Sequence, residues 1–163
     1  MTEDPAITDH DRKLLRAAIE VSRRARERGN HPFGAVLADP DGRIVLEAEN
    51  SVTTEVDCTA HAETSLARAA WKEVGGEALS RYSLYTSCEP CAMCSGAIYW
   101  SGIGRVVYAM TEAQLAELTG DHAENPTMSL ASATVLNSGR RTITVAGPAV
   151  ADEAKAVHVG FWS

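Results

Sequence analysis

The stretch from Tyr85 to Trp100 reads YTSCEPCAMCSGAIYW. Its first residues are typical of the end of a strand, and Pro90 fits the first turn of a helix, where its missing N–H is not needed. Cys91 and Cys94 are three residues apart, so they lie on one face of that helix, close enough to hold one metal ion. Unpaired backbone N–H groups and the helix dipole favour thiolates there. The stretch therefore predicts a strand-to-helix corner that presents two metal ligands.

Two thiolates leave a zinc ion short of ligands, and His61 is the obvious third. Zinc with three protein ligands keeps a fourth position for water, which is typical of catalytic rather than structural sites. Glu63 follows His61 by two residues at the expected start of another helix, so its carboxylate can lie beside that water without binding the metal. H-x-E combined with P-C-x-x-C is the pattern of zinc deaminases. Either motif alone is a weak signal, whereas the two together are a strong one.

Other interpretations use the same cysteines. Adding Cys88 to the three ligands gives a closed Cys₃His structural site, and the chain would then be a zinc module for protein interaction. That interpretation leaves Glu63 and the open position without a role. Cys88 and Cys91 could instead form a redox dithiol before the helix. This second alternative ignores His61 and Cys94, so catalytic zinc is the preferred interpretation.

Length and composition are those of an ordinary globular chain. The 163 residues suit one domain with a sizeable core, so residues 1–163 are expected to form a single deaminase domain. The chain has no apolar run of about 18 residues, and its first residues do not resemble a signal peptide. Three of the 4 cysteines are crowded into one short segment, which indicates metal ligands in a reducing compartment. We therefore expect no membrane association and a cytoplasmic location.

The formal net charge of −7 argues against a nucleic-acid partner, which requires a positively charged footprint. The basic cluster at Arg23, Arg24, Arg26 and Arg28 spreads around the polar face of a helix and is interrupted by Glu27. A solvated surface explains it better than a binding stripe. A small, neutral or weakly charged substrate is the better expectation.

Hydrophobic periodicity, caps and turn residues predict alternating helices and strands. The expected strands are residues 35–38, 43–48, 82–86, 105–110 and 141–145. The expected helices are residues 8–28, a segment from 61 to the glycines at 75 and 76, a segment from 90 to 100, and residues 152–157, with a mixed signal over 111–136. Because a helix joins the third strand to the fourth, those two are expected to be parallel. The predicted fold is a three-layer α/β/α sandwich with a mixed five-stranded sheet.

With these residues in place, the chain resembles the cytidine-deaminase-like zinc deaminases, above all the bacterial guanine deaminases and next to them the tRNA adenosine deaminases. The similarity runs from about Pro32 to Met110. It is closest in four segments, namely residues 32–36, 50–54, 57–63 and 86–100. The resemblance implies one zinc ion per chain and a homodimer whose chain termini can reach the neighbouring active site.

The resemblance also implies roles for residues around the metal. Asn50 would hydrogen-bond the base, Phe33 and Trp100 would help to wall the pocket, and Ala62 would lend its backbone N–H. Guanine deaminases carry an additional acidic residue after the fourth strand that assists proton transfer. Here that residue aligns only loosely, so three candidates for a second proton shuttle remain: Asp121, Glu117 and His122.

The expected reaction is hydrolytic deamination of a free aminated nucleobase, guanine first, with release of ammonia. Zinc lowers the pKa of its bound water, and Glu63 moves that proton to the ring nitrogen beside the attacked carbon. Because the metal centre meets only the N–C(NH₂)–N unit, cytosine, isoguanine, an amino-triazine or a nucleoside are alternatives. Adenosine in tRNA comes last, since the stretch from Tyr99 to Gly102 departs from those enzymes.

The carboxyl-terminal aromatic pair Phe161 and Trp162 is expected to cover the active site as a lid. Two large aromatic side chains are costly to leave exposed, since each buries about 150–250 Å² when packed. Gly160 provides a bend just before them. The alternative is that the pair caps the sheet edge or a dimer interface.

Overall fold

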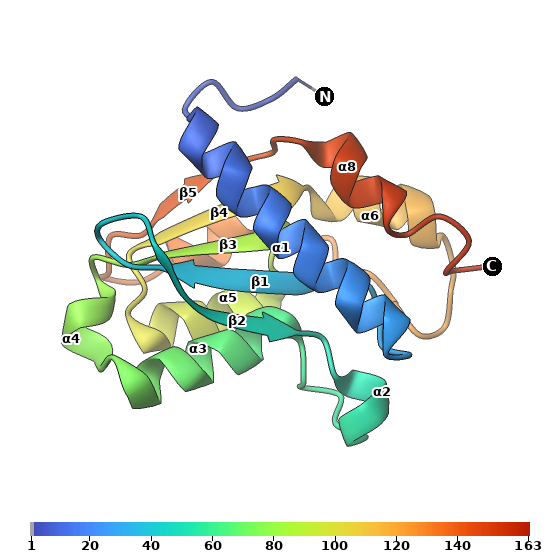
Figure 1. Cartoon of the computed structure of the whole chain (residues 1–163), viewed down its shortest axis with the longest axis horizontal. Helices are drawn as coiled ribbons and strands as arrows, with labels where there is room; N and C mark the ends of the chain where they lie inside the picture. Colours follow the sequence, from blue (N-terminus) through green and yellow to red (C-terminus); the bar gives the residue numbers. More distant parts are fainter. Residues whose placement is uncertain (1) are drawn as a thin grey trace.

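A mixed five-stranded sheet forms the centre of the computed structural model, which describes residues 2–163. The strands, in the spatial order β2-β1-β3-β4-β5, are β1 Gly34–Ala38, β2 Ile44–Glu49, β3 Ser83–Cys88, β4 Arg105–Met110 and β5 Thr144–Ala146. The helices are α1 Asp9–Glu27, α2 Val52–Glu55, α3 Ala62–Glu73, α4 Gly76–Leu79, α5 Ala92–Ser101, α6 Glu112–Thr119, α7 Ser132–Leu136 and α8 Ala151–Ala156. Helices cover both faces of the sheet (Figure 1), so the predicted three-layer fold is confirmed.

Strand directions follow from the lengths of the connections. β1 is antiparallel to both β2 and β3, whereas β3, β4 and β5 run parallel. The crossover from β3 through α5 to β4 is the parallel unit that the sequence predicts. The register pairs Cys88 with Met110, so the carboxyl ends of β3 and β4 meet at one edge of the sheet. Side chains that follow these two strands are thereby placed close together.

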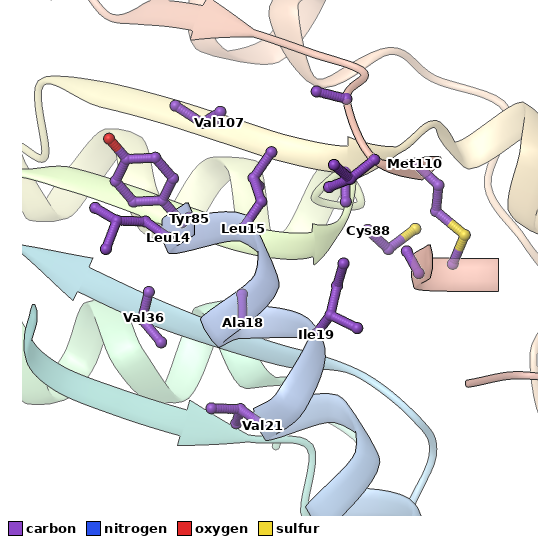
Figure 2. Close-up of a cluster of buried hydrophobic side chains, with 14 of the residues drawn as sticks. Leu14, Leu15, Ala18, Ile19, Val21, Val36, Tyr85, Cys88, Val107 and Met110 are labelled. Atoms are coloured by element: carbon purple, nitrogen blue, oxygen red, sulfur yellow. The ribbon is translucent and has the colours of Figure 1, made fainter. Parts of the chain in front are cut away.

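Hydrophobic side chains form one cluster on each face of the sheet. Figure 2 shows the first, in which Leu15, Ala18 and Ile19 of α1 pack against Val36, Val107 and other residues of the sheet. The second lies under α3, α5 and α7 and includes Leu66, Leu84 and Ile98. Because successive strand residues point to opposite faces, neighbouring positions of the fully buried β1 supply both clusters. Burial on both faces keeps the sheet, and the edge that carries the site, in place.

A partly buried ion pair connects α1 to the sheet. Arg105 Nη1 and Nη2 donate to the two Asp11 oxygens at 2.8 and 3.0 Å, and the Tyr85 hydroxyl donates to Asp11 Oδ1 at 2.8 Å. Burial acts to raise the pKa of Asp11, but hydrogen bonds from Arg105 and the Thr8 backbone outweigh it and hold that pKa well below its usual value. Two-point contacts of this kind are among the stronger hydrogen bonds in proteins. The contact joins α1 to both β3 and β4.

Several boundaries differ from the sequence-based expectation. α5 begins at Ala92 with Cys91 as its N-cap, so Pro90 precedes the helix and does not occupy its first turn. Gly75 ends the α3 segment in a positive-φ conformation, as expected, but Gly76 opens the short helix α4. The fifth strand begins at Thr144, because only three of its residues pair with β4. The mixed segment 111–136 resolves into α6 and α7 joined by a loop.

No helix within residues 2–163 combines the length and the apolar character needed to cross a membrane.

Candidate active site

The starts of two neighbouring helices bring three ligand atoms together. His61 is the N-cap of α3 and Cys91 is the N-cap of α5, and these helices lie side by side under the sheet (Figure 1). His61 Nδ1 lies 3.7 Å from Cys91 Sγ and 3.5 Å from Cys94 Sγ. All three ligand atoms lie within 4.8 Å of one another. Two motifs about thirty residues apart in the sequence thus meet at one point.

The spacing of these atoms fits a zinc ion. Tetrahedral zinc with Zn–S of about 2.3 Å and Zn–N of about 2.0–2.1 Å separates its ligand atoms by roughly 3.5–3.8 Å. The two sulfur-to-nitrogen distances, 3.5 and 3.7 Å, agree with this geometry. The Thr64 hydroxyl donates to Cys94 Sγ at 3.2 Å, a contact of the kind that orients and stabilises a thiolate ligand. Two sulfurs and one imidazole nitrogen are donors that zinc prefers.

One thiolate is favoured in this group even without metal. The hydrogen bond from Cys94 lowers the pKa of Cys91, and the neighbouring His61 lowers it further against the effect of burial. The hydrogen bond to Cys91 together with burial raises the pKa of Cys94. The hydrogen bond to Cys91 also raises the pKa of His61. Electrostatics therefore prepares the group for a cation.

Glu63 lies beside the three ligands and is 5 % exposed. The Thr86 hydroxyl of β3 donates to Glu63 Oε1 at 2.7 Å, while Oε2 lies 3.5 Å from Cys94 Sγ. Burial raises the pKa of Glu63, and the hydrogen bond from Thr86 acts in the opposite direction. One oxygen is thus held by the sheet and the other faces the metal-ligand group. A carboxyl group in this setting is suited to accept and return a proton.

A cavity of about 400 Å³ opens onto Glu63 and the ligand group. Its apolar lining includes Phe33, Val52, Met93, Leu115, Pro126 and Met128. Its polar lining includes His31, Asn50, Glu63, Glu89, Glu112 and Glu124. The size and the mainly apolar wall with a few polar groups are typical of small-molecule sites.

Asn50 is 2 % exposed and has one end of its amide free for a ligand. Its Oδ1 accepts from the backbone N–H of Val52 at 3.2 Å, and its own backbone N–H donates to the Phe33 carbonyl at 3.0 Å. The Nδ2 group is therefore left as a hydrogen-bond donor. Ala62 is the first residue of α3, where a backbone N–H has no acceptor inside the helix. The Asn50 donor lines the cavity, whereas Ala62 is fully buried and does not.

Five of the residues singled out from the sequence line this cavity: His61, Cys91, Glu63, Asn50 and Phe33. Cys94 does not line it but lies with His61 and Cys91 in the metal-ligand group. The expectation that Trp100 helps to wall the pocket is not met in this chain, because its side chain is 74 % exposed and does not line the cavity. It follows Cys94 by six residues, about 9 Å further along α5, which carries it away from the metal ligands.

The three residues proposed as a second proton shuttle also lie elsewhere. Glu117 and Asp121 are exposed and do not line the cavity. The His122 ring packs against Trp162 at 5.4 Å, and its Nδ1 accepts from the Glu124 backbone N–H at 3.2 Å. The three candidates came from a loose alignment with guanine deaminases after β4, which explains why they do not lie at the cavity.

Glu112 and Glu124 are the carboxylates of that region that do reach the cavity, and sequence reasoning missed both. Glu112 follows the carboxyl end of β4, where ligands of open α/β sheets commonly bind. The tendency of ligands to bind at the carboxyl ends of strands was therefore the signal that could have identified Glu112. Glu124 Oε2 lies 3.2 Å from His31 Nε2, a pairing across 93 residues that no local pattern reveals.

The carboxyl-terminal aromatic pair packs behind the cavity wall. Trp162 is buried, and its Nε1 donates to His158 Nδ1 at 3.0 Å. Its ring lies 5.5 Å from the His31 ring and 6.3 Å from the Phe33 ring, both of which line the cavity. Neither Phe161 nor Trp162 lines the cavity itself. The segment supports two walls of the site and does not extend across its opening in this chain.

Comparison with known proteins places residues 8–110 within the cytidine and deoxycytidylate deaminase zinc-binding region. A probable cytosine deaminase of Schizosaccharomyces pombe is 40 % identical over 156 residues, which are 96 % of this chain and 94 % of the relative. Guanine deaminase of Bacillus subtilis is 44 % identical over 109 residues, 67 % of this chain and 69 % of the relative. The solved structure of guanine deaminase from Nitrosomonas europaea has a TM-score of 0.76 and 26 % identity, covering 96 % of this chain and 86 % of that structure.

Proposed function

Because the chain belongs to the cytidine and deoxycytidylate deaminase zinc-binding family, we propose that it deaminates a free aminated nucleobase, with guanine as its first substrate. The family and the relatives make it a hydrolytic deaminase of a nucleobase-type substrate. One observation carries the assignment of the site. A buried glutamate, Glu63, and three zinc-type ligand atoms within 4.8 Å of one another meet at the floor of the same cavity.

His61, Cys91 and Cys94 would hold the zinc ion of this family. When bound there, zinc supplies the Lewis-acid chemistry that makes water a nucleophile near neutral pH. Glu63 accepts the proton that the attacking water loses and delivers it to the ring nitrogen beside the attacked carbon. It then takes the proton of the newly formed hydroxyl group and passes it to the amino group, so that the C–N bond breaks, ammonia leaves and the hydroxyl oxygen becomes a carbonyl oxygen. Thr86 keeps Glu63 Oε2 directed toward the reacting atoms.

The remaining lining residues would bind and orient the ring. Asn50 Nδ2 would donate to a carbonyl oxygen or ring nitrogen of the base, because its Oδ1 is already occupied by Val52. Phe33 would cover the ring and exclude water, which strengthens the polar contacts of the site. The Ala62 N–H would donate to the edge of the base. The positions of Asn50 and Phe33 in the cavity lining support their assignments, and the resemblance to guanine deaminases supports that of Ala62, which does not line the cavity.

Guanine is preferred for two reasons. Of the two relatives described above, guanine deaminase has the higher sequence identity, 44 % against 40 %. Its alignment includes the segment that holds the metal-ligand group. A cavity of about 400 Å³ is also within the range of ligand sites that hold molecules larger than a single small ring.

Cytosine is the second candidate, and one observation favours it. The Schizosaccharomyces pombe relative aligns over 96 % of the chain. Its match therefore includes residues after Met110, among them Glu112 and Glu124 in the cavity lining. The alignment with guanine deaminase covers 67 % of the chain and leaves the rest unmatched.

Ammonia release from free bases tests the proposal. The zinc-loaded protein is incubated with guanine, cytosine, isoguanine, an amino-triazine, guanosine and cytidine, and kcat/KM is compared. The proposal expects free bases to exceed nucleosides, with guanine highest. Cytosine above guanine would move the assignment to the second candidate, and activity on nucleosides alone would refute a free-base enzyme.

We further propose a homodimer formed through α3 and α5. Trp71 and Trp100 are 53 % and 74 % exposed on these adjacent helices, and large exposed aromatics commonly mark interaction surfaces. Light scattering on the wild type and on the Trp71→Ser/Trp100→Ser variant tests this. A dimer that becomes a monomer in the variant is expected, and a monomeric wild type would contradict the proposal.

The other expectations about the whole chain also stand as proposals. We treat residues 1–163 as one deaminase domain, since both hydrophobic clusters pack on the same sheet. A cytoplasmic location is consistent with thiol ligands, which need a reducing compartment. A nucleic-acid partner is not proposed, because the formal net charge is −7.

A further inference from the structure

His158 is a buried imidazole that the reaction described above does not use. It lies just after α8 and is 3 % exposed, and its Nδ1 accepts from Trp162 Nε1 at 3.0 Å. An indole N–H can only donate, so this bond requires a neutral imidazole without a proton on Nδ1. Within residues 2–163, His158 Nε2 is the one buried side-chain nitrogen or oxygen that has no hydrogen-bond partner. The fold therefore satisfies one nitrogen of this ring and encloses the other without a partner.

Charges next to His158 disfavour a proton on its ring. Burial, together with Arg26 of α1, lowers the pKa of His158 from its ordinary value of 6.5 to about 4. Arg26 Nη1 donates to the two backbone carbonyls that flank His158 in the sequence, at 2.6 and 2.7 Å. On α8, Lys155 lies 3.8 Å from Asp152 in an ion pair. Among the described residues, no carboxylate raises the pKa of His158 to offset Arg26, so a charged imidazole here would lack a counter-ion.

The other titratable groups of this region surround Trp162. The rings of His31, before β1, and His122, after α6, lie 5.5 and 5.4 Å from the Trp162 ring. Glu124 Oε2 lies 3.2 Å from His31 Nε2, so the carboxylate of this group is paired with a different imidazole. Of the three histidines, His158 is the one that a hydrogen bond joins to Trp162.

Trp162 and His158 together support the cavity wall. The Phe33 ring lies 5.3 Å from the His158 ring and 6.3 Å from the Trp162 ring, and both Phe33 and His31 line the cavity. Trp162 is 9 % exposed, and its bond to His158 is the one hydrogen bond of its indole within residues 2–163. Loss of that bond would free the ring that supports two cavity residues.

We propose that His158 is a positioning residue, which holds Trp162 behind the cavity wall while its ring is neutral and releases it when the ring gains a proton. A proton on Nδ1 would face the Trp162 N–H, so two donors would meet without an acceptor. The charged ring would also remain buried beside Arg26, and burial of an unpaired charge is strongly unfavourable. Both penalties disappear when residues 158–163 move into water. Acid would thus withdraw the support of Phe33 and His31 and weaken substrate binding.

The direction of the pH effect follows from the lowered pKa. Packing of residues 158–163 against the wall is strongest above about pH 6.5 and weakens as pH falls from 6.5 toward 4. From these two values, the equilibrium constant for that packing should be about 20-fold lower at pH 5 than at pH 7. Amide hydrogen exchange of a peptide holding residues 159–163 measures the change, because local opening sets the exchange rate. Rates are corrected for the intrinsic effect of pH, and the zinc content of the protein is measured at both pH values.

Histidine variants identify the ring that gains the proton. Wild type is expected to lose about 20-fold of its exchange protection in this peptide between pH 7 and pH 5. His158→Asn keeps an acceptor near the position of Nδ1 but cannot gain a proton, so its protection should be equal at the two pH values. His10→Asn removes an exposed histidine from the first turn of α1 and is the matched control, which should behave as wild type. A wild type without this change, or a change that persists in His158→Asn, would overturn the proposal. Loss of the change in His122→Asn but not in His158→Asn would assign it to the wrong ring and equally refute it.

Substrate affinity tests the link to the cavity, and this part of the test rests on the proposed function. KM for the best base substrate should rise more between pH 7 and pH 5 in wild type than in His158→Asn. The fall in kcat as Glu63 gains a proton should be common to both proteins. Equal KM profiles would show that the segment does not position the wall, and would overturn the role of His158. A protein that deaminates no base would instead refute the proposed function and leave the exchange measurement unaffected, so the two failures are distinguishable.

Discussion

Thr86 offers a sharp test of how the fold prepares Glu63. Thr86→Val keeps the shape of a fully buried side chain and removes the hydroxyl that donates to Glu63 Oε1 at 2.7 Å. A hydrogen bond to a charged group contributes about 1.5–3 kcal/mol. At 1.36 kcal/mol per pKa unit, its loss should raise the pKa of Glu63 by about one to two units. The same free energy lost from the transition state lowers kcat/KM by about 10- to 150-fold.

The sign of the pH effect follows from the direction of the pKa change. Glu63 acts as a base when ionised, so activity falls as pH drops through its pKa, and the variant should lose activity at a higher pH than wild type. The assay is kcat/KM for ammonia release from guanine between pH 5 and 9, with zinc content measured at each pH. Thr86→Ser keeps the hydroxyl and is the matched control. An acid limb of Thr86→Val that coincides with wild type at full activity would refute the assigned role.

Three further variants test other parts of the structure. Asp11→Asn should lower the free energy of unfolding at pH 7 by about 1–3 kcal/mol, as measured by urea denaturation. Because Arg105 holds the pKa of Asp11 below its usual value, this difference should be complete above roughly pH 5 and shrink as pH falls further; a constant difference would be contrary evidence. Cys88→Ser should retain one zinc ion per chain by elemental analysis, and loss of zinc would favour the closed structural site. Trp162→Ala should destabilise by about 3–5 kcal/mol in thermal denaturation and raise KM, because its ring supports His31; an unchanged KM would argue against that support.

The residues that the sequence identified are those whose relation is local or set by helix geometry. Cys91 and Cys94 share a helical face at any position in the fold, and His61 with Glu63 is a spacing of two at a helix start. Bringing the two motifs together needs one long-range assumption, namely that the starts of α3 and α5 lie side by side, and the packing of α3 against α5 satisfies it. The parallel pairing of the third and fourth strands followed similarly from the helix that connects them.

The differences between the sequence-based predictions and the structure concern the directions of side chains and a segment with little regular secondary structure. Trp100 belongs to a motif that contains two ligands, yet the turn of α5 carries it to the surface. Glu117 and Asp121 lie in a region with little periodicity, where a displacement of a few residues decides whether a carboxylate enters the cavity. Glu112 enters it because of where β4 ends. The contact of His31 with Trp162 joins opposite ends of the chain, and only the tertiary structure reveals it.

Ammonia release by the wild type and by Glu63→Gln, each with its zinc content measured, tests the proposed mechanism most directly. The variant is isosteric, so it should fold and retain one zinc ion per chain while its carboxamide can no longer accept the proton. We expect zinc-dependent release of ammonia from guanine by the wild type and a loss in kcat on the order of 10²–10⁴-fold or more in the variant. Zinc-loaded Glu63→Gln turning over at the wild-type rate would contradict the mechanism.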